Sequence, residues 1–183
     1  DRELDTRICA DFPKINPAQI AIDPGLPKEK HMRWAALLRH QTPEEAVAIL
    51  RQLKLDNDTI SKAKTLVQWW KRPIGADQTQ IRKTMSQMAP ELYDDLLILK
   101  ASVGELELQA EGCVEDLDWV KAQSGEIRQR GDCVSLKELA VTGADLIQAG
   151  MKPGKELGET LKRLLELVLE HPEWNTKEIL KKV

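Results

Sequence analysis

The stretch "GMKPGKELGETLKR", from Gly150 to Arg163, holds residue types that suit the binding of a phosphate group. Gly and Pro set a turn that carries Lys152 and Lys155, and Leu157 then opens a series of apolar residues at helical spacing. The first backbone N–H groups of a helix lack partners within the helix and carry the positive end of its dipole, so an anion can bind there. The stretch also suits a plain turn between two helices with solvated lysines, and taken alone it favours that reading.

A search for catalytic residues finds no convincing constellation. No histidine has a partner at the spacing of a zinc site, and none is followed by Asp. The three histidines are His31, His40 and His171. Adjacent acids such as Asp94 and Asp95 point apart on a helix, and no P-loop, GxGxxG or GxSxG motif occurs. A spaced pair of Asp residues on a strand, which two-metal nucleotidyl transfer requires, is also missing. We therefore expect a chain without catalytic or metal-binding residues of its own.

Composition indicates an ordinary soluble protein. The 183 residues are 42% apolar and 31% charged, which is enough for a buried core. The net charge of −3 gives no overall attraction to nucleic acid, so such a role needs a local basic patch. The odd number of cysteines, with no CxxC pair, fits a reducing cytoplasm. The sequence has no apolar run long enough to predict a membrane span.

Helix signals dominate, and we predict an all-α fold. Expected helices cover residues 28–40, 42–54, 57–71 and 77–88, and one or two long helices cover 91–130, with Gly104 and Gly112 as weak points. Residues 1–26 are expected to be irregular because they are rich in proline. In the last third we predict Thr142 and Asn175 as N-caps, Gly150 as a C-cap and Gly158 as a position of close helix packing.

Charge is unevenly distributed along the chain. A basic island contains a single acid, Asp77, and its cations are Lys62, Lys64, Lys71, Arg72, Arg82 and Lys83. Within it, Trp69 and Trp70 are neighbours on a predicted helix, so they point about 100° apart and one of them should lie near the surface. The following segment, 91–118, is acidic apart from Lys100. This pattern indicates either a polarised binding face or two simply solvated faces.

The segment "CVSLKELAVTGADLIQAGMKPGKELGETLKRLLELVLEHPEWNTKEIL" (133–180) resembles the C-terminal domain of bacterial CCA-adding enzymes, tRNA nucleotidyltransferases of the poly(A) polymerase family. Upstream, "LPKEKHMRWAALLRHQTPEEAVAILRQLKLDNDTISKAKTLVQWW" resembles the helical middle region of that family, which in many members is an HD-type domain. Here Arg39-His40-Gln41, Trp70-Lys71-Arg72-Pro73 and Lys100-Ala101-Ser102 stand where the metal-binding residues would be. The resemblance therefore implies a degenerate HD scaffold that has lost its metal.

This resemblance implies an irregular segment 1–26, a helical body at 27–130 and a tRNA-binding tail at 131–183. The catalytic head of the family is N-terminal to this body, so we expect a C-terminal part of a longer cytoplasmic enzyme. The head would use Mg²⁺ with CTP and ATP, and this chain would need no cofactor. The partner implied is tRNA, which the chain would bind through the acceptor and T arms of the tRNA.

Contact residues are expected in both parts of the chain. Lys152, Gly154 and Lys155 are predicted to touch the tRNA elbow, and Lys71 and Arg72 the stem. Lys64, Lys162 and Arg163 are further candidates. Two alternatives remain open, namely a surviving HD-type phosphohydrolase and a metal-free helical module for protein interaction or homodimer formation.

Overall fold

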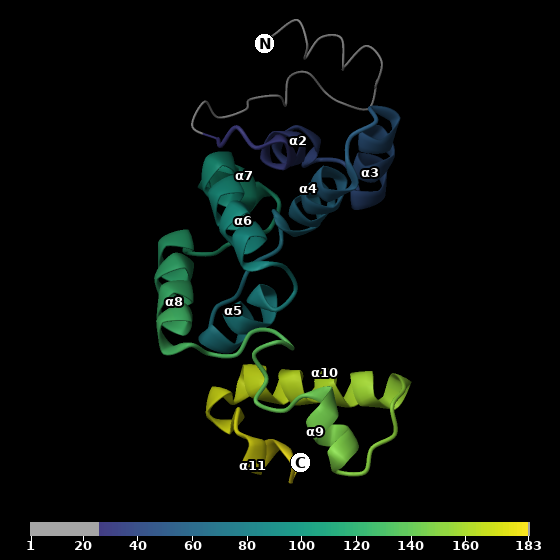
Figure 1. The fold of residues 1–183 in the computed structure, drawn as a ribbon. Helices are drawn as coiled ribbons and strands as arrows, with labels where there is room; N and C mark the ends of the chain where they lie inside the picture. The colour runs from purple at the N-terminus through teal and green to yellow at the C-terminus, as the bar shows by residue number, and fades with distance from the viewer. Residues whose placement is uncertain (1–25, 183) are drawn as a thin grey trace, which may run out of the picture. The chain divides into compact units, whose positions relative to one another are not determined.

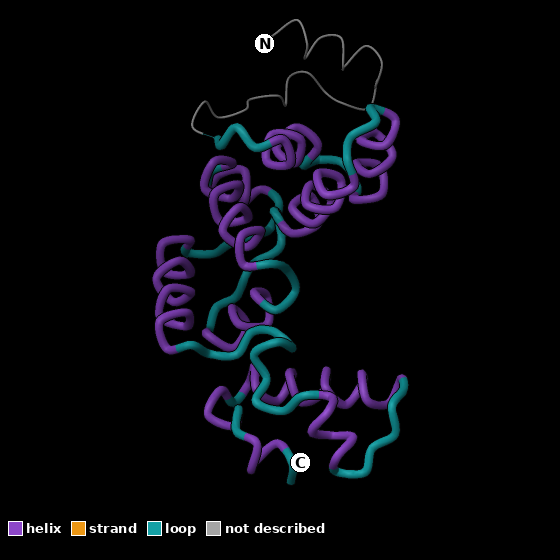
Figure 2. Tube along the Cα trace, viewed as in Figure 1, coloured by secondary structure: helices purple, strands orange, loops and turns teal. Residues whose placement is uncertain are grey.

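The computed structural model describes residues 26–182, so the irregular segment expected at 1–26 lies almost entirely outside the described residues. In the described part the secondary structure is ten α-helices and one short 3₁₀ helix joined by loops, with no strand, as Figure 2 shows. The all-α prediction is confirmed. Among these helices, none is both long enough and apolar enough to cross a membrane.

Helices are named here as in Figure 1. They are α2 (Lys30–Leu38), α3 (Pro43–Gln52), α4 (Asn57–Trp69), α5 (Gln78–Met85), α6 (Pro90–Val103), α7 (Glu105–Ala110), α8 (Leu117–Arg130), α9 (Gly143–Gln148), α10 (Lys155–Glu170), η2 (Pro172–Trp174) and α11 (Lys177–Leu180).

The chain forms two compact units, and each is described by itself. Among the described residues, the first unit comprises residues 26–73 together with Met88–Leu117, and the second comprises Ile74–Gln87 together with residues 118–182. The segment that contains α5 therefore packs with the second unit, although the sequence placed it in the helical body. The functional division into body and tail at residue 130 stays a prediction.

In the first unit α4 is the central helix, and it packs against α2, α3 and α6. Local sequence explains where these helices begin. Thr42 and Glu45 form a reciprocal capping box at the start of α3, with Pro43 in its first turn. The Asp56 side chain accepts a hydrogen bond from the Thr59 N–H at the start of α4. The buried face of α4 includes Ile60, Ala63, Leu66 and Val67, as its apolar spacing predicts.

Residues 91–130 form parts of three helices rather than the one or two expected. The first break lies at Gly104, whose φ of 86° is a left-handed conformation that favours glycine and ends α6. The second break follows Gly112, where φ is 78°. The glycines were recognised as weak points, but a Gly in the left-handed region ends a helix outright rather than weakening it.

The second unit is built around α10, which packs against α5, α9 and η2. Figure 1 shows α9 and α11 on the same side of α10. The shared core of this tail consists of Cys133, Leu139, Val141, Leu146, Leu164, Val168 and Leu180. Gly150 ends α9 as predicted, because its φ of 104° turns the chain so that the following Met151 N–H donates to the Leu146 carbonyl oxygen at 3.0 Å.

Two details of the tail differ from the predictions. An added Cβ at Gly158 would meet no atom within 4 Å, so this glycine makes no close helix contact, whereas one at Gly143 would lie 3.4 Å from Leu157 Cδ2. The N-cap of α11 is Thr176 rather than Asn175. The Asn175 side chain instead accepts a hydrogen bond from Ala140 N–H at 2.8 Å and donates one to the Glu138 carbonyl oxygen at 3.0 Å. A cap residue and a loop-holding residue look alike in sequence because both are short and polar.

Candidate RNA-binding surfaces

The start of α10 is open to solvent, as the sequence predicted. Gly154 is the N-cap residue and has no side chain to accept a hydrogen bond from the first turn. Lys152, Gly154 and Lys155 are all exposed, and the side chain of Lys155 is 91% exposed. The three predicted residues thus lie together at the start of α10, where no side chain caps the first N–H groups of the helix. Glu156 also lies in the first turn, so the cationic character comes from the lysines and the helix dipole together.

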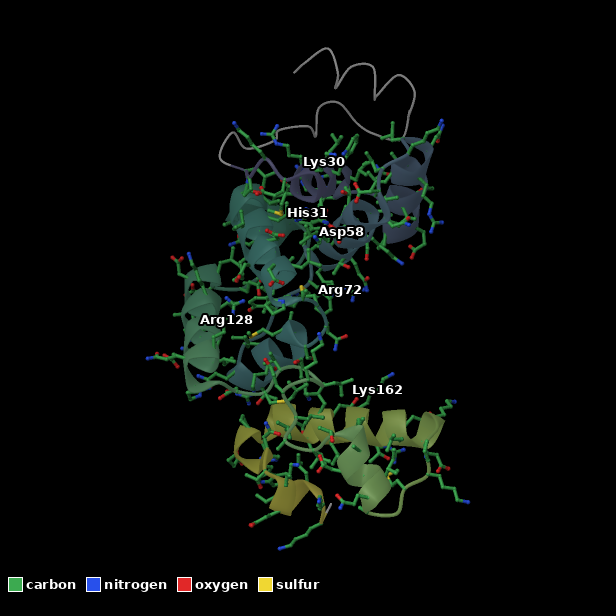
Figure 3. All side chains as sticks on the ribbon, viewed as in Figure 1. Lys30, His31, Asp58, Arg72, Arg128 and Lys162 are labelled. Atoms are coloured by element: carbon green, nitrogen blue, oxygen red, sulfur yellow. The ribbon has the colours of Figure 1, made fainter. Side chains whose placement is uncertain are left out.

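Farther along α10 the surface carries both signs of charge. Lys162 and Arg163 are exposed, and Figure 3 labels Lys162 on this helix. The exposed acids Glu159 and Glu166 lie at helical spacing from Lys155 and Lys162, and Lys155 approaches Glu159 at 3.5 Å. An exposed i,i+4 pair of this kind is weak. The start of α10 differs from the rest of this surface because its cations lie beside free backbone N–H groups.

In the first unit the candidate surface is the end of α4 and the turn after it. Trp70 is fully buried and its Nε1–H donates to the Arg39 carbonyl oxygen at 2.6 Å, while Trp69 is half-buried. The prediction that one of the paired tryptophans lies near the surface is confirmed. Arg72 is exposed, with its Cζ atom 5.4 Å from the centroid of the Trp69 ring, a cation–π arrangement. Figure 3 marks Arg72 at this end of α4.

The other two predicted cations of this region differ in their surroundings. Lys71 Nζ lies 3.4 Å from Glu111 Oε2, and the Lys71 side chain is 53% exposed. Lys64 is exposed on α4 and makes no ion pair in the part of the chain that the structure describes. Both ammonium groups are accessible to an anion, but Lys71 would have to break its ion pair with Glu111 to bind an anion.

Two cations of the basic island, Arg82 and Lys83, lie on α5 in the second unit. Arg82 is buried, and its Nε donates to the Leu169 carbonyl oxygen at 2.7 Å while its Nη1 lies 3.3 Å from Asp132 Oδ2. Lys83 pairs with Glu170 at 2.7 Å, and this pairing lowers the pKa of the Glu170 carboxyl group. Arg82 therefore has a structural role and is not part of an exposed basic face.

Lys100, the lone base of the acidic segment, is fully buried. Its ammonium group donates to the Arg72 carbonyl oxygen at 2.7 Å and to Glu115 Oε1 at 2.5 Å, and it lies 3.2 Å from Cys113 Sγ. Burial raises the pKa of the Cys113 thiol, and the nearby ammonium group opposes that rise. Sequence reasoning missed Lys100 as a residue that supports the α4 surface. Its place four residues after Leu96, on the apolar face of α6, was the available signal.

Arg39 and His40, which the sequence resemblance compared with HD-type metal-binding residues, make contacts within the first unit. Arg39 is buried and its Nε donates to Glu107 Oε1 at 2.8 Å. The His40 ring packs edge-on against Trp70, with the ring centroids 5.5 Å apart. Within residues 26–182 no group of three His, Cys, Asp or Glu side chains has an arrangement that could hold a metal ion.

Comparison with protein families identifies this chain. Residues 27–183 match the family described as "tRNA nucleotidyltransferase domain 2 putative". Because the match covers most of the chain, the chain belongs to this family, and its function is related to that of tRNA nucleotidyltransferases. Searches of curated proteins and of solved structures found no significant match.

Proposed function

We propose that this chain is the tRNA-binding body and tail of a bacterial CCA-adding tRNA nucleotidyltransferase, an enzyme of the poly(A) polymerase family. In this proposal the chain holds the acceptor and T arms of tRNA, while a catalytic head outside these residues adds the 3′ CCA from CTP and ATP with Mg²⁺. The helical body derives from an HD-type domain, and the enzyme acts in the cytoplasm.

The observation that carries the proposal is the match of residues 27–183 to a tRNA nucleotidyltransferase domain. A-form RNA offers phosphates and 2′-hydroxyl groups more readily than base edges, so its recognition needs exposed cations and backbone donors. The start of α10 supplies both, through Lys152, Lys155 and the unsealed N–H groups that follow Gly154. Helix α4 and the turn after it supply two further exposed cations, Lys64 and Arg72.

The test is titration of the 183-residue chain with tRNA at two salt concentrations. Binding to phosphate groups weakens as salt rises, and removing one cation that binds a phosphate lowers the slope of log affinity against log salt by about 1. Lys152→Gln and Lys155→Gln are expected to weaken binding and lower this slope. Lys137→Gln is the matched control because Lys137 is also exposed in the second unit but lies outside the predicted surfaces.

Three results would count against the proposal. Undetectable tRNA binding at low salt would refute an RNA role for the chain. Equal reductions in affinity for Lys137→Gln and Lys155→Gln would show that the start of α10 is not a specific surface. Self-association in light scattering, without tRNA affinity, would favour the alternative of a dimerisation module. The parent activity needs a separate measurement, namely incorporation of CTP and ATP into tRNA by the chain joined to its head.

A further inference from the structure

The side chains of Trp69 and Arg72 have a feature that phosphate binding does not require. The Arg72 Cζ atom lies over the Trp69 ring, 5.4 Å from its centroid, so the cation and the aromatic ring already form one surface. Arg72 is exposed and makes no ion pair within residues 26–182, whereas its neighbour Lys71 pairs with Glu111 at 3.4 Å. The guanidinium donors of Arg72 are therefore available to a ligand.

The backbone that carries this stack is anchored from within the core. The ammonium group of Lys100, fully buried, donates to the carbonyl oxygen of Arg72 itself at 2.7 Å. Between the two stacked residues, Trp70 is fully buried and its indole N–H donates to the Arg39 carbonyl oxygen at 2.6 Å. Because the backbone is held at both positions, little ordering of the main chain would be needed when a ligand binds.

A planar cation on an aromatic ring suits a flat ligand more than a lone phosphate. Nucleobases stack on aromatic rings and on guanidinium planes, but only where they are unpaired, because paired bases stack on each other. A phosphate contact alone would be served as well by a lysine, which has no plane to stack. Building on the tRNA binding proposed above, we propose that Trp69 and Arg72 form a stacking site for an unpaired nucleotide of the bound RNA.

Two RNA probes test this site, a blunt-ended RNA hairpin and the same hairpin with a short single-stranded 3′ extension. The wild-type chain is expected to bind the extended hairpin more tightly, by about 5- to 10-fold, from the stacking of one base. Arg72→Lys keeps the charge but removes the plane, so it should abolish this preference and leave affinity for the blunt hairpin nearly unchanged. Trp69→Leu should do the same, and Trp69→Phe, which keeps a ring, should retain most of the preference.

Lys64→Gln is the control variant, because Lys64 is exposed on the same helix and takes no part in the stack. It should weaken binding of both hairpins by the same factor, as expected when a cation that binds a phosphate is removed. If Trp69→Leu proves unfolded by circular dichroism, Arg72→Lys alone decides the question, since Arg72 is a surface residue.

The outcomes separate the two proposals. Tight binding of both hairpins by the wild-type chain without any preference would overturn the stacking site and leave tRNA binding intact. A preference that survives in Arg72→Lys, or an equal reduction in affinity for both hairpins, would also overturn it, the latter in favour of a phosphate contact. Failure of the wild-type chain to bind either hairpin or tRNA would overturn the proposed function, and the stacking site with it.

Discussion

The Nε atom of Arg82 lies 2.7 Å from the carbonyl oxygen of Leu169, a residue 87 positions away in sequence. This carbonyl group belongs to the last turn of α10, where helix carbonyl groups lack partners within the helix. The guanidinium group also interacts favourably with the negative end of the helix dipole. Through Asp132, whose side chain is 7% exposed, the same group reaches the loop after α8, and Arg130 pairs with that carboxylate as well. One side chain thus joins α5, α10 and this loop within the second unit.

Replacement of Arg82 by Met should therefore destabilise the second unit strongly. The variant would lack the bond to Leu169 and leave the nearly buried Asp132 with only Arg130 as a cationic partner. Removal of one partner of a buried pair typically costs about 3–5 kcal/mol, and the pair that remains with Arg130 places our expectation at about 3 kcal/mol. Urea unfolding would measure the change. Lys83 is also on α5, and its ion pair with Glu170 is exposed. Lys83→Gln should therefore change the free energy of unfolding by less than about 1 kcal/mol.

Gly158 lies within α10 with no neighbour near the position of a Cβ atom. Gly158→Ala should therefore stabilise the protein by about 1 kcal/mol, because Ala has the higher helix propensity. Gly125→Ala in α8 should act in the same direction, since its Cβ position is also open. The contrasting variant is Gly154→Ala, where φ is 155° and a side chain would be strained. Equilibrium unfolding of the three variants would show this order, and a destabilised Gly158→Ala would contradict the open surroundings of this glycine.

Asp145 should contribute to the decline of stability in acid. Its side chain bonds to Lys177 and to Thr142, and these bonds hold the pKa of the carboxyl group well below its usual range. A carboxyl group with a lowered folded-state pKa stabilises the fold above its unfolded pKa, near 3.8, and this stability disappears as the pH falls toward the folded value.

Asp145→Asn should consequently lower the melting temperature at about pH 7 and make less difference below about pH 3, where the unfolded chain takes up a proton on Asp145. Thermal unfolding at a series of pH values would test this. Glu178 is an exposed acid on α11 without an ion pair in the described part of the chain. Glu178→Gln should therefore change the melting temperature little at every pH. A gap between wild type and Asp145→Asn that stays constant with pH would contradict the role of the charge.

Features that depend on neighbouring residues were predictable from the sequence. Spacings of one to four residues predict the capping box of Thr42 and Glu45 and the start of α6 at Pro90. They also predict that only one of the neighbours Trp69 and Trp70 is fully buried. The open start of α10 followed in the same way, since Gly154 cannot cap a helix with a side chain.

Features that depend on distant partners were not predictable. Arg82 resembles its exposed neighbour Lys83 in sequence, and only the packing of α5 against α10 buries one and exposes the other. Lys100 is likewise a charged residue whose partners, the Arg72 carbonyl oxygen and Glu115, are supplied by other parts of the first unit. Patterns of charge along a chain indicate surface composition, and they do not indicate which cation finds a buried acceptor.

The side-chain amide of Asn175 pairs with the main chain of the Glu138–Ala140 stretch much as a neighbouring β-strand pairs with the edge of a sheet. Its oxygen accepts from one main-chain N–H group and its NH₂ group donates to one main-chain carbonyl group. The loop before α9 therefore takes its shape from a residue near the other end of the tail. Proteolytic removal of Asn175 and the residues after it would therefore loosen this loop as well as α11, so the two segments should lose protection from proteases together.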